Sequence, residues 1–156
     1  AVELPYAGNT LAMWVILPSS SDTSLNALLT PATLSAVRSS LRPTAVKLSL
    51  PRWDFSTDLN LKPILQTLGI HAAFAPDADF SAISPGLFIS QAVHRANITV
   101  DEWGTEAAAV TGLAFAAGAL MPQTTLDVDH PFAFAIVHKA TGTVIFEGSV
   151  ADPTAR

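Results

Sequence analysis

Apolar and polar positions alternate in several stretches of the chain, which predicts a structure rich in short strands. Leu11–Leu17 is an apolar run of strand length that follows a Gly8-Asn9 turn, so we expect a hairpin with the segment before that turn. Val46–Phe55 begins with strict alternation, and Pro51 marks a bend or an edge position within it. The predicted strands cover residues 11–17, 46–55, 87–103, 132–137 and 143–150.

Apolar residues at helical spacing lie between these strands and predict three helices. The clearest predicted helix begins after Thr30, which can cap it. Pro31 then occupies the first helical position, where proline is favoured. Another stops before Gly69, a residue that suits helix ends. The predicted helices are a short one capped by Asp22 or Thr23 and two longer ones at 31–41 and 59–68. Strands outnumber helices, so the predicted fold class is α+β.

The composition allows a sizeable core and excludes several classes of protein. Of 156 residues, 49% are hydrophobic and 13% are charged, a balance that excludes intrinsic disorder and fits one domain or a large part of one. The net charge is −5 and no run of Lys or Arg occurs, so no nucleic-acid surface is expected. No run reaches the roughly 18 apolar residues of a membrane span, so no membrane partner is expected.

The residues that usually hold metals or perform catalysis give no support for such a site. The chain has no cysteine, which excludes disulfides and a thiolate zinc site and leaves the redox compartment open. The four histidines are scattered, without the spacing of a metalloprotease motif. We therefore expect no metal, no cofactor and no catalytic residue.

Residues 104–122 differ from the rest of the chain, because they are almost all Gly, Ala and Thr with a few large apolar residues. Composition alone is equally compatible with an Ala-rich helix. Together with the motifs around it, however, the segment resembles the serpin family of protease inhibitors, collinearly from Val2 to Pro153. The matching motifs are LPR (50–52), DL (58–59), LGI (68–70), ADFS (78–81), VDEWGTEAAAVTG (100–112), HPFAFAI (130–136) and TGTVIFEG (141–148).

The resemblance implies the serpin fold, of which residues 1–156 would form the C-terminal part of a single domain, with the N-terminal portion absent. The reactive loop would span about residues 102–126. The implied function is that of a serine-protease inhibitor and not of an enzyme: the protease cuts the loop, and the freed strand inserts into a sheet. The implied partners are a serine protease and the missing N-terminal portion. The family is often extracellular or secreted.

Insertion explains the composition of the expected hinge. Side chains of a strand alternate between faces, so every second hinge residue must become buried. One alternating set is small and uncharged, and it comprises Thr105, Ala107, Ala109 and Thr111. The other set holds the only charge, and it comprises Gly104, Glu106, Ala108 and Val110. A buried charge costs several kcal/mol, whereas Ala and Thr cost little, so the pattern suits a loop that becomes a central strand.

The bond that the protease cuts is expected within a short window. Counting from Glu102 at the usual loop length of the family puts Gly118 before the bond and Ala119 after it. Counting back from Pro131 shifts the estimate toward Leu120 and Met121. No Lys or Arg occurs between residues 104 and 127, so a trypsin-like target is not expected. Elastase-, chymotrypsin- or subtilisin-like proteases, which prefer small or apolar side chains, fit better.

The resemblance also implies two residues that support the sheet where it opens. Glu102 matches a hinge glutamate that pairs with a basic residue on the neighbouring strand, and Arg52 occupies that basic position here. The alternative is two solvated charges whose attraction contributes about 0–1 kcal/mol. His94 stands where the family carries a histidine under the sheet opening, hydrogen-bonded to polar residues from earlier strands. The alternative for His94 is a buried structural histidine whose ring nitrogens are hydrogen-bonded, which differs little from the role that the resemblance implies.

Two other functions stay open. A non-inhibitory serpin of the chaperone or carrier type would tolerate bulky or charged hinge residues, and the small hinge residues argue against it. An inactive fragment that acts only as a β-rich binding module is the second. Because the strands between which the loop inserts would lie in the absent portion, we expect that these 156 residues alone do not inhibit by insertion.

Overall fold

The computed structural model describes residues 1–20, 24–101, 104–105 and 124–153, and the chain divides into two units. The first unit consists of Ala1–Trp53 and Thr99–Arg156, and the second of Asp54–Ile98. Strands outnumber helices, so the predicted α+β class is confirmed. None of the helices in the described ranges combines the length and the apolar character that crossing a bilayer requires.

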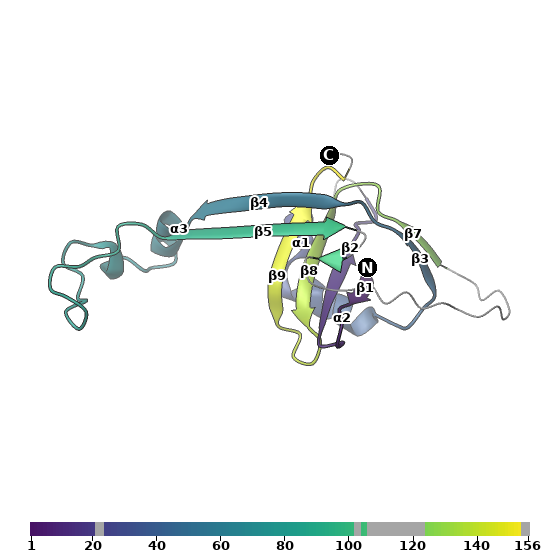
Figure 1. The fold of residues 1–156 in the computed structure, drawn as a ribbon, viewed down its shortest axis with the longest axis horizontal. Coiled ribbons are helices and arrows are strands. Elements are labelled where there is room, and N and C mark those ends of the chain that lie inside the picture. Colours follow the sequence, from purple (N-terminus) through teal and green to yellow (C-terminus); the bar gives the residue numbers. More distant parts are fainter. Residues whose placement is uncertain (21–23, 102–103, 106–123, 154–156) are drawn as a thin grey trace. The chain divides into compact units, whose positions relative to one another are not determined.

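A four-stranded antiparallel sheet forms the core of the first unit (Figure 1). In spatial order its strands are β1 (Val2–Pro5), β2 (Leu11–Ile16), β8 (Phe132–His138) and β9 (Val144–Val150). The hairpin predicted near the N-terminal end is confirmed, and the strands predicted at 132–137 and 143–150 also pair with each other. The pairing of β2 with β8 joins the two pairs in one sheet. The central position of β2 explains its continuous apolar run, because residues 12–16 are at most 5% exposed.

Small side chains on one face of this sheet let a helix pack closely. Helix α2 (Pro31–Ser40) lies on that face, and α1 (Leu25–Leu28) contacts both α2 and β8. The buried cluster between helix and sheet comprises Leu34 and Val37 of α2 with Ala12, Trp14, Ile16, Ala133, Ala135 and Val137 of the strands. Alternation along β8 therefore places its alanines under the helix and its phenylalanines on the opposite face.

Large aromatic side chains fill the opposite face of the sheet. Phe132 and Phe134 are fully buried, and the ring of Trp53 lies 5.3 and 5.5 Å from theirs, centroid to centroid. Such ring pairs stabilise a core by about 0.5–1.5 kcal/mol beyond their burial. Gly148 of β9 is the antiparallel partner of Phe134, and a Cβ at that position would lie 2.7 Å from the Phe134 ring. The ring thus occupies the space that any side chain at residue 148 would need.

Hydrogen bonds from side chains fix both ends of α2. At its start Thr30 acts as the predicted cap, because its Oγ1 accepts a hydrogen bond from the Thr33 amide at 3.3 Å. Near its end the guanidinium of Arg38 donates to three carbonyls of the turn between β8 and β9. These carbonyls belong to Lys139, Ala140 and Thr141, at 3.3, 3.0 and 3.1 Å. The helix is therefore tied to the C-terminal hairpin.

The remaining strands form two smaller sheets. β3 (Val46–Ser49) and β7 (Thr124–Asp127) pair in parallel within the first unit. β4 (Trp53–Asn60), β5 (Val93–Asp101) and β6 (Gly104–Thr105) form a three-stranded sheet in that order, and the boundary between the units crosses β4 and β5. The second unit also contains α3 (Leu61–Thr67) and the short 3-10 helix η1 (Ala72–Phe74).

Several predicted boundaries were wrong. The strand predicted at 46–55 is two strands, interrupted around Pro51, which has no amide hydrogen to donate to a ladder. The helix predicted from residue 59 begins at Leu61, because β4 continues to Asn60, whose side chain accepts the Lys62 amide at 3.2 Å and caps the helix. Residues 87–92 were predicted as strand, but β5 begins only at Val93. The caps predicted at 22 or 23 lie outside the described residues.

Replacing Gly148 by alanine should destabilise the first unit by about 1–3 kcal/mol, because the added methyl group presses on the fully buried ring of Phe134. Urea unfolding followed by tryptophan fluorescence measures the change. Ser149→Ala on the same strand is the matched control and should shift stability by less than about 0.5 kcal/mol. An unfolding midpoint of Gly148→Ala equal to that of the unchanged protein would show that the ring can move aside.

Candidate functional site

β5 and β7 border the segment that the sequence predicts as the reactive loop. β5 ends at Asp101 and β7 begins at Thr124. Between them, Gly104 and Thr105 are described as β6, which pairs antiparallel with the end of β5, Thr105 opposite Val100. The other expected loop positions lie outside the described residues, and their roles stay predictions. They are Glu102, residues 106–111 of the hinge and residues 118–121 of the scissile window.

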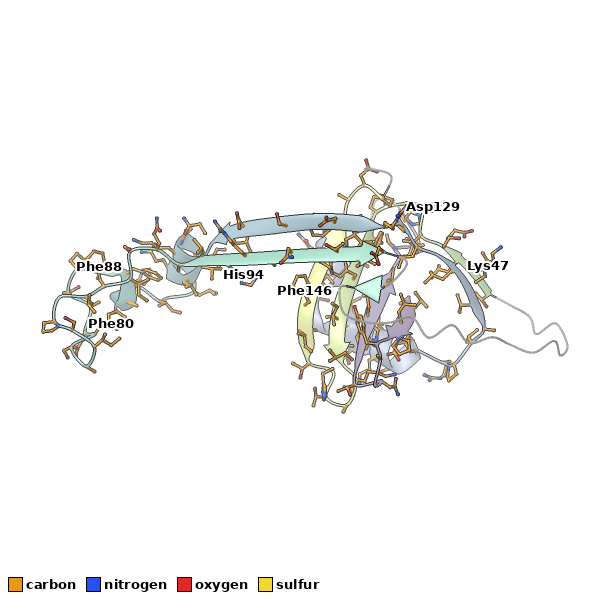
Figure 2. The ribbon with its side chains drawn as sticks, in the orientation of Figure 1. Lys47, Phe80, Phe88, His94, Asp129 and Phe146 are labelled. Carbon is orange, nitrogen blue, oxygen red and sulfur yellow. The ribbon has the colours of Figure 1, made fainter. Side chains whose placement is uncertain are left out.

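The two residues expected to support the opening sheet are both described and both exposed. Arg52 lies between β3 and β4 and interacts with another group, but its expected partner Glu102 lies outside the described residues. His94 lies on β5 (Figure 2), and no hydrogen bond to its ring occurs within the ranges that the structure describes. The roles expected for Arg52 and His94 therefore remain predictions.

At the C-terminal end of the loop region, β7 is held to β3 by backbone and side-chain hydrogen bonds. The Thr124 amide donates to the Ala45 carbonyl at 3.0 Å, and the Val128 amide donates to the Ser49 carbonyl at 2.9 Å. Ser49 Oγ also donates to Asp127 Oδ1 at 2.6 Å, between two residues that are partners in the ladder. A two-stranded sheet is only marginally stable by itself, so each of these bonds matters for the attachment of β7.

A pair of titratable side chains follows β7. His130 Nδ1 lies 2.8 Å from Asp129 Oδ1, and His130 Nε2 lies 3.0 Å from the carbonyl oxygen of Pro18 (Asp129 is labelled in Figure 2). The hydrogen bond to Pro18, followed by the bond to Asp129, raises the pKa of His130 above its ordinary value. The hydrogen bond from His130 lowers the pKa of Asp129. Sequence reasoning missed this arrangement, because nothing in the pattern links residue 130 to a carbonyl at residue 18.

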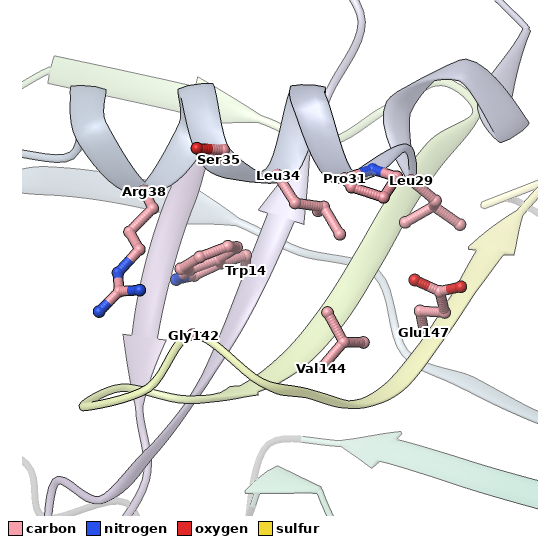
Figure 3. A pocket seen from close by; sticks show the side chains of 9 residues that line it. All are labelled: Trp14, Leu29, Pro31, Leu34, Ser35, Arg38, Gly142, Val144 and Glu147. Atoms are coloured by element: carbon pink, nitrogen blue, oxygen red, sulfur yellow. The ribbon is translucent and has the colours of Figure 1, made fainter.

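A pocket of about 390 Å³ lies between the helices and the sheet of the first unit (Figure 3). Its lining residues are Trp14, Leu29, Pro31, Leu34, Ser35, Arg38, Gly142, Val144 and Glu147. Trp14 Nε1 donates to Glu3 Oε2 at 2.9 Å, which leaves the apolar ring of Trp14 to line the pocket. Arg38 and Glu147 bring opposite charges to the lining.

The volume of the pocket falls in the range of small-molecule sites, and its lining combines apolar side chains with two charged groups. Sequence reasoning also missed this pocket. Its lining residues come from β2, the helices and the C-terminal hairpin, and no local motif connects these segments.

Comparison with known proteins agrees with the sequence motifs. A family model described as "Serpin (serine protease inhibitor)" matches residues 1–153. Serpin A3-7 of Bos taurus is 40% identical over 155 residues, which cover 97% of this chain and 37% of that protein. Leukocyte elastase inhibitor of Bos taurus is 36% identical over 162 residues, which cover 97% of this chain and 43% of that protein. The chain thus spans about two fifths of the length of these curated relatives.

Solved structures show the same similarity. The thermophilic serpin tengpin in its native state is 35% identical, with a TM-score of 0.75, and the match covers 95% of this chain and 40% of tengpin. Thyroxine-binding globulin in complex with thyroxine is 27% identical, with a TM-score of 0.77, and the match covers 98% of this chain and 41% of that protein. The chain therefore has the fold of part of a serpin.

Replacing Ser49 by alanine should speed hydrogen exchange of the Val128 amide about 2- to 10-fold, because loss of the bond to Asp127 weakens the β3–β7 pair. NMR measures this rate in the 156-residue chain. Ser39→Ala is the control, since the Ser39 hydroxyl donates to the Ser35 carbonyl within α2 and should leave Val128 unaffected. Equal exchange of Val128 in both variants would mean that the Ser49–Asp127 bond does not hold β7.

Proposed function

Because the chain belongs to the serpin family, we propose that it carries the reactive loop of a serine-protease inhibitor. The proposed inhibitor is a suicide substrate: the target protease cuts the loop, and the freed hinge then inserts into the sheet as an additional strand. In this role the protein binds a protease and is not itself an enzyme. We further propose an extracellular or secreted location, which is common in the family.

The pairing of β6 with β5 is the observation that carries this proposal. β6 lies beside β5 on the side opposite to β4, so β5 offers its edge to the hinge. One of the two strands that flank the inserted hinge would therefore be β5 of this chain, and not a strand of the absent portion as expected from the sequence. If the register continued into the hinge, Ala107 would lie opposite Ile98, and Ala109 opposite Ala96. Ile98 is 4% exposed, and cross-strand partners share a face of the sheet, so the small set would enter the buried face. Glu106 would then lie on the other face.

Strand addition also supplies the free energy for the rearrangement. Each new ladder hydrogen bond contributes about 0.5–1.5 kcal/mol net, so on the order of a dozen bonds could contribute about 10 kcal/mol. A charge on the buried face would offset several kcal/mol of this gain. A charged substitution in the set that enters the buried face should therefore impair insertion, whereas the same substitution in the other set should not.

In the full-length serpin that contains this chain, Ala109→Arg should reduce covalent complex with an elastase-like protease at least about tenfold and increase simple cleavage. The arginine would have to enter the buried face of the sheet, and a penalty of about 1.4 kcal/mol already corresponds to a factor of ten. Ala108→Arg is the matched control, since residue 108 would lie on the other face and should keep most of the complex. Gel electrophoresis under denaturing conditions separates complex from cleaved inhibitor. Equal loss of complex in both variants would contradict face-selective insertion.

The target is proposed to be a protease that prefers small or apolar side chains. No Lys or Arg occurs between residues 104 and 127, so a pocket with an acidic base has no suitable side chain to bind there. The name of one relative, leukocyte elastase inhibitor, supports the same class of target for this chain.

Mass spectrometry of the peptide released by an elastase-like protease should place the cut within residues 118–121. Replacing the residue before that cut by arginine should create a covalent complex with trypsin, because the basic side chain then fits the acidic specificity pocket. Arginine at Thr124, beyond the window, is the control and should not have this effect. A cut outside 118–121 would refute the predicted window.

A carrier is the second candidate function. The pocket beside Trp14 and the similarity to thyroxine-binding globulin in complex with thyroxine favour it. A carrier without inhibitory activity would form no covalent complex with any serine protease, whereas the proposed inhibitor forms one. The same electrophoresis therefore separates the two functions.

A further inference from the structure

His130 occupies the C-terminal root of the loop region, defined here as residues 127–131 between the end of β7 and the start of β8. Its imidazole bridges this root to the carbonyl oxygen of Pro18, which follows β2 and lies 112 positions earlier in the chain. The side chain is 36% exposed, so solvent protons can reach it while both ring nitrogens remain engaged. The ring is thus the link between two segments that are distant in sequence.

Both partners of the imidazole can only accept hydrogen bonds. Asp129 Oδ1, as a carboxylate, and the Pro18 carbonyl each require an N–H on the nitrogen that faces them. A neutral imidazole carries one N–H and can satisfy one of the two. An imidazolium carries two N–H groups and satisfies both, so the observed geometry fits the protonated ring.

We propose that His130 is a proton-dependent clamp, which fastens the C-terminal root of the loop region to the segment after β2 when the ring is protonated and loosens when the ring loses its proton. The bond to Pro18 holds the root from one side, and the Val128 amide, which donates to Ser49 O, holds it from the other. Loosening the clamp frees the backbone next to Val128 and weakens the attachment of β7. The clamp would regulate the reactive loop only if the chain has the proposed inhibitory function, and this part of the proposal rests on that function.

The charges around the root favour the protonated ring. Asp129 is its direct partner, and Asp127 at the end of β7 is a further acidic group of the root. Glu147 lies on β9, the strand paired with β8. Basic side chains also lie on the adjoining elements: Lys47 on β3, the partner of β7, and Arg52, next to the Trp53 ring that contacts Phe132. Arg52 is engaged with another group.

The sign of the pH dependence follows from the two pKa shifts. The pKa of His130 is raised, so its contribution is fully present below the ordinary value of 6.5 and is lost as pH rises through the higher value of the folded state. The pKa of Asp129 is lowered, so its contribution is present above 3.8 and is lost as pH falls through the folded value. The clamp is therefore tightest between these limits and opens on the alkaline side.

Two NMR measurements on the 156-residue chain test the clamp. In a histidine titration, the midpoint of His130 should lie above 6.5 and should fall in Asp129→Asn. Between pH 5 and 9, exchange of the Val128 amide, relative to that of the Leu34 amide in α2, should rise about 2- to 10-fold across the His130 midpoint, which corresponds to one lost hydrogen bond.

The variants separate the proton from the side chain. In His130→Gln the pH-dependent rise in Val128 exchange should vanish, because glutamine can donate to the Pro18 carbonyl but does not titrate. His71→Gln is the control: His71 is an exposed histidine at the start of η1, and its replacement should leave the rise in Val128 exchange unchanged. If His130→Gln fails to fold, Asp129→Asn replaces it as the test variant, because it keeps the imidazole ring and should lower the midpoint of His130. An exchange ratio independent of pH in the unchanged chain, or a rise that persists in His130→Gln, would overturn the clamp.

The clamp and the inhibitor fail in different ways. If the Val128 rise is present but the full-length serpin forms no covalent complex with any serine protease, the proposed function fails and the clamp stands. If the complex forms but the Val128 rise is missing, the clamp fails and the proposed function stands.

Discussion

Antiparallel pairing of β6 with the end of β5 is the contact on which the functional account depends. It fixes which hinge residues would share a face with Ile98, which is buried. Alternation along an inserted strand would then divide the proposed hinge into a buried set that must be small and uncharged and an outer set that can carry Glu106. The proposed insertion would thus account for the glycine, alanine and threonine content of the segment by one geometric requirement.

The two ends of the loop region are attached by different means. At the N-terminal end β6 pairs with β5, a nine-residue strand that also pairs with β4, so an inserted hinge would extend a ladder that already exists. At the C-terminal end the four-residue strand β7 is attached to β3 by the ladder and by the Ser49–Asp127 bond, and the proposed clamp at His130 would hold the root that follows it. The four-stranded sheet of the first unit supplies the rigid base, because β8 begins directly after this root.

Much of the fold could be predicted from the sequence, because local patterns determine it. The continuous apolar run of β2, the Thr30-Pro31 start of α2 and the turns of both hairpins are signals within a few residues of each other. The bend predicted at Pro51 is a complete break between β3 and β4, and β4 extends to Asn60. Neither strand end was predicted, since periodicity does not locate element ends. The pocket and the bond from His130 to Pro18 could not be predicted, because both join segments more than 100 positions apart.

The central claim is that the small hinge residues enter a sheet once the loop is cut. Thermal unfolding of a full-length serpin in which this chain forms the C-terminal part, before and after cleavage by an elastase-like protease in the proposed window 118–121, tests it most directly. A dozen new ladder bonds should raise the midpoint by on the order of 20 °C. A cleaved form that unfolds at the same temperature as the intact form, or below it, would contradict insertion.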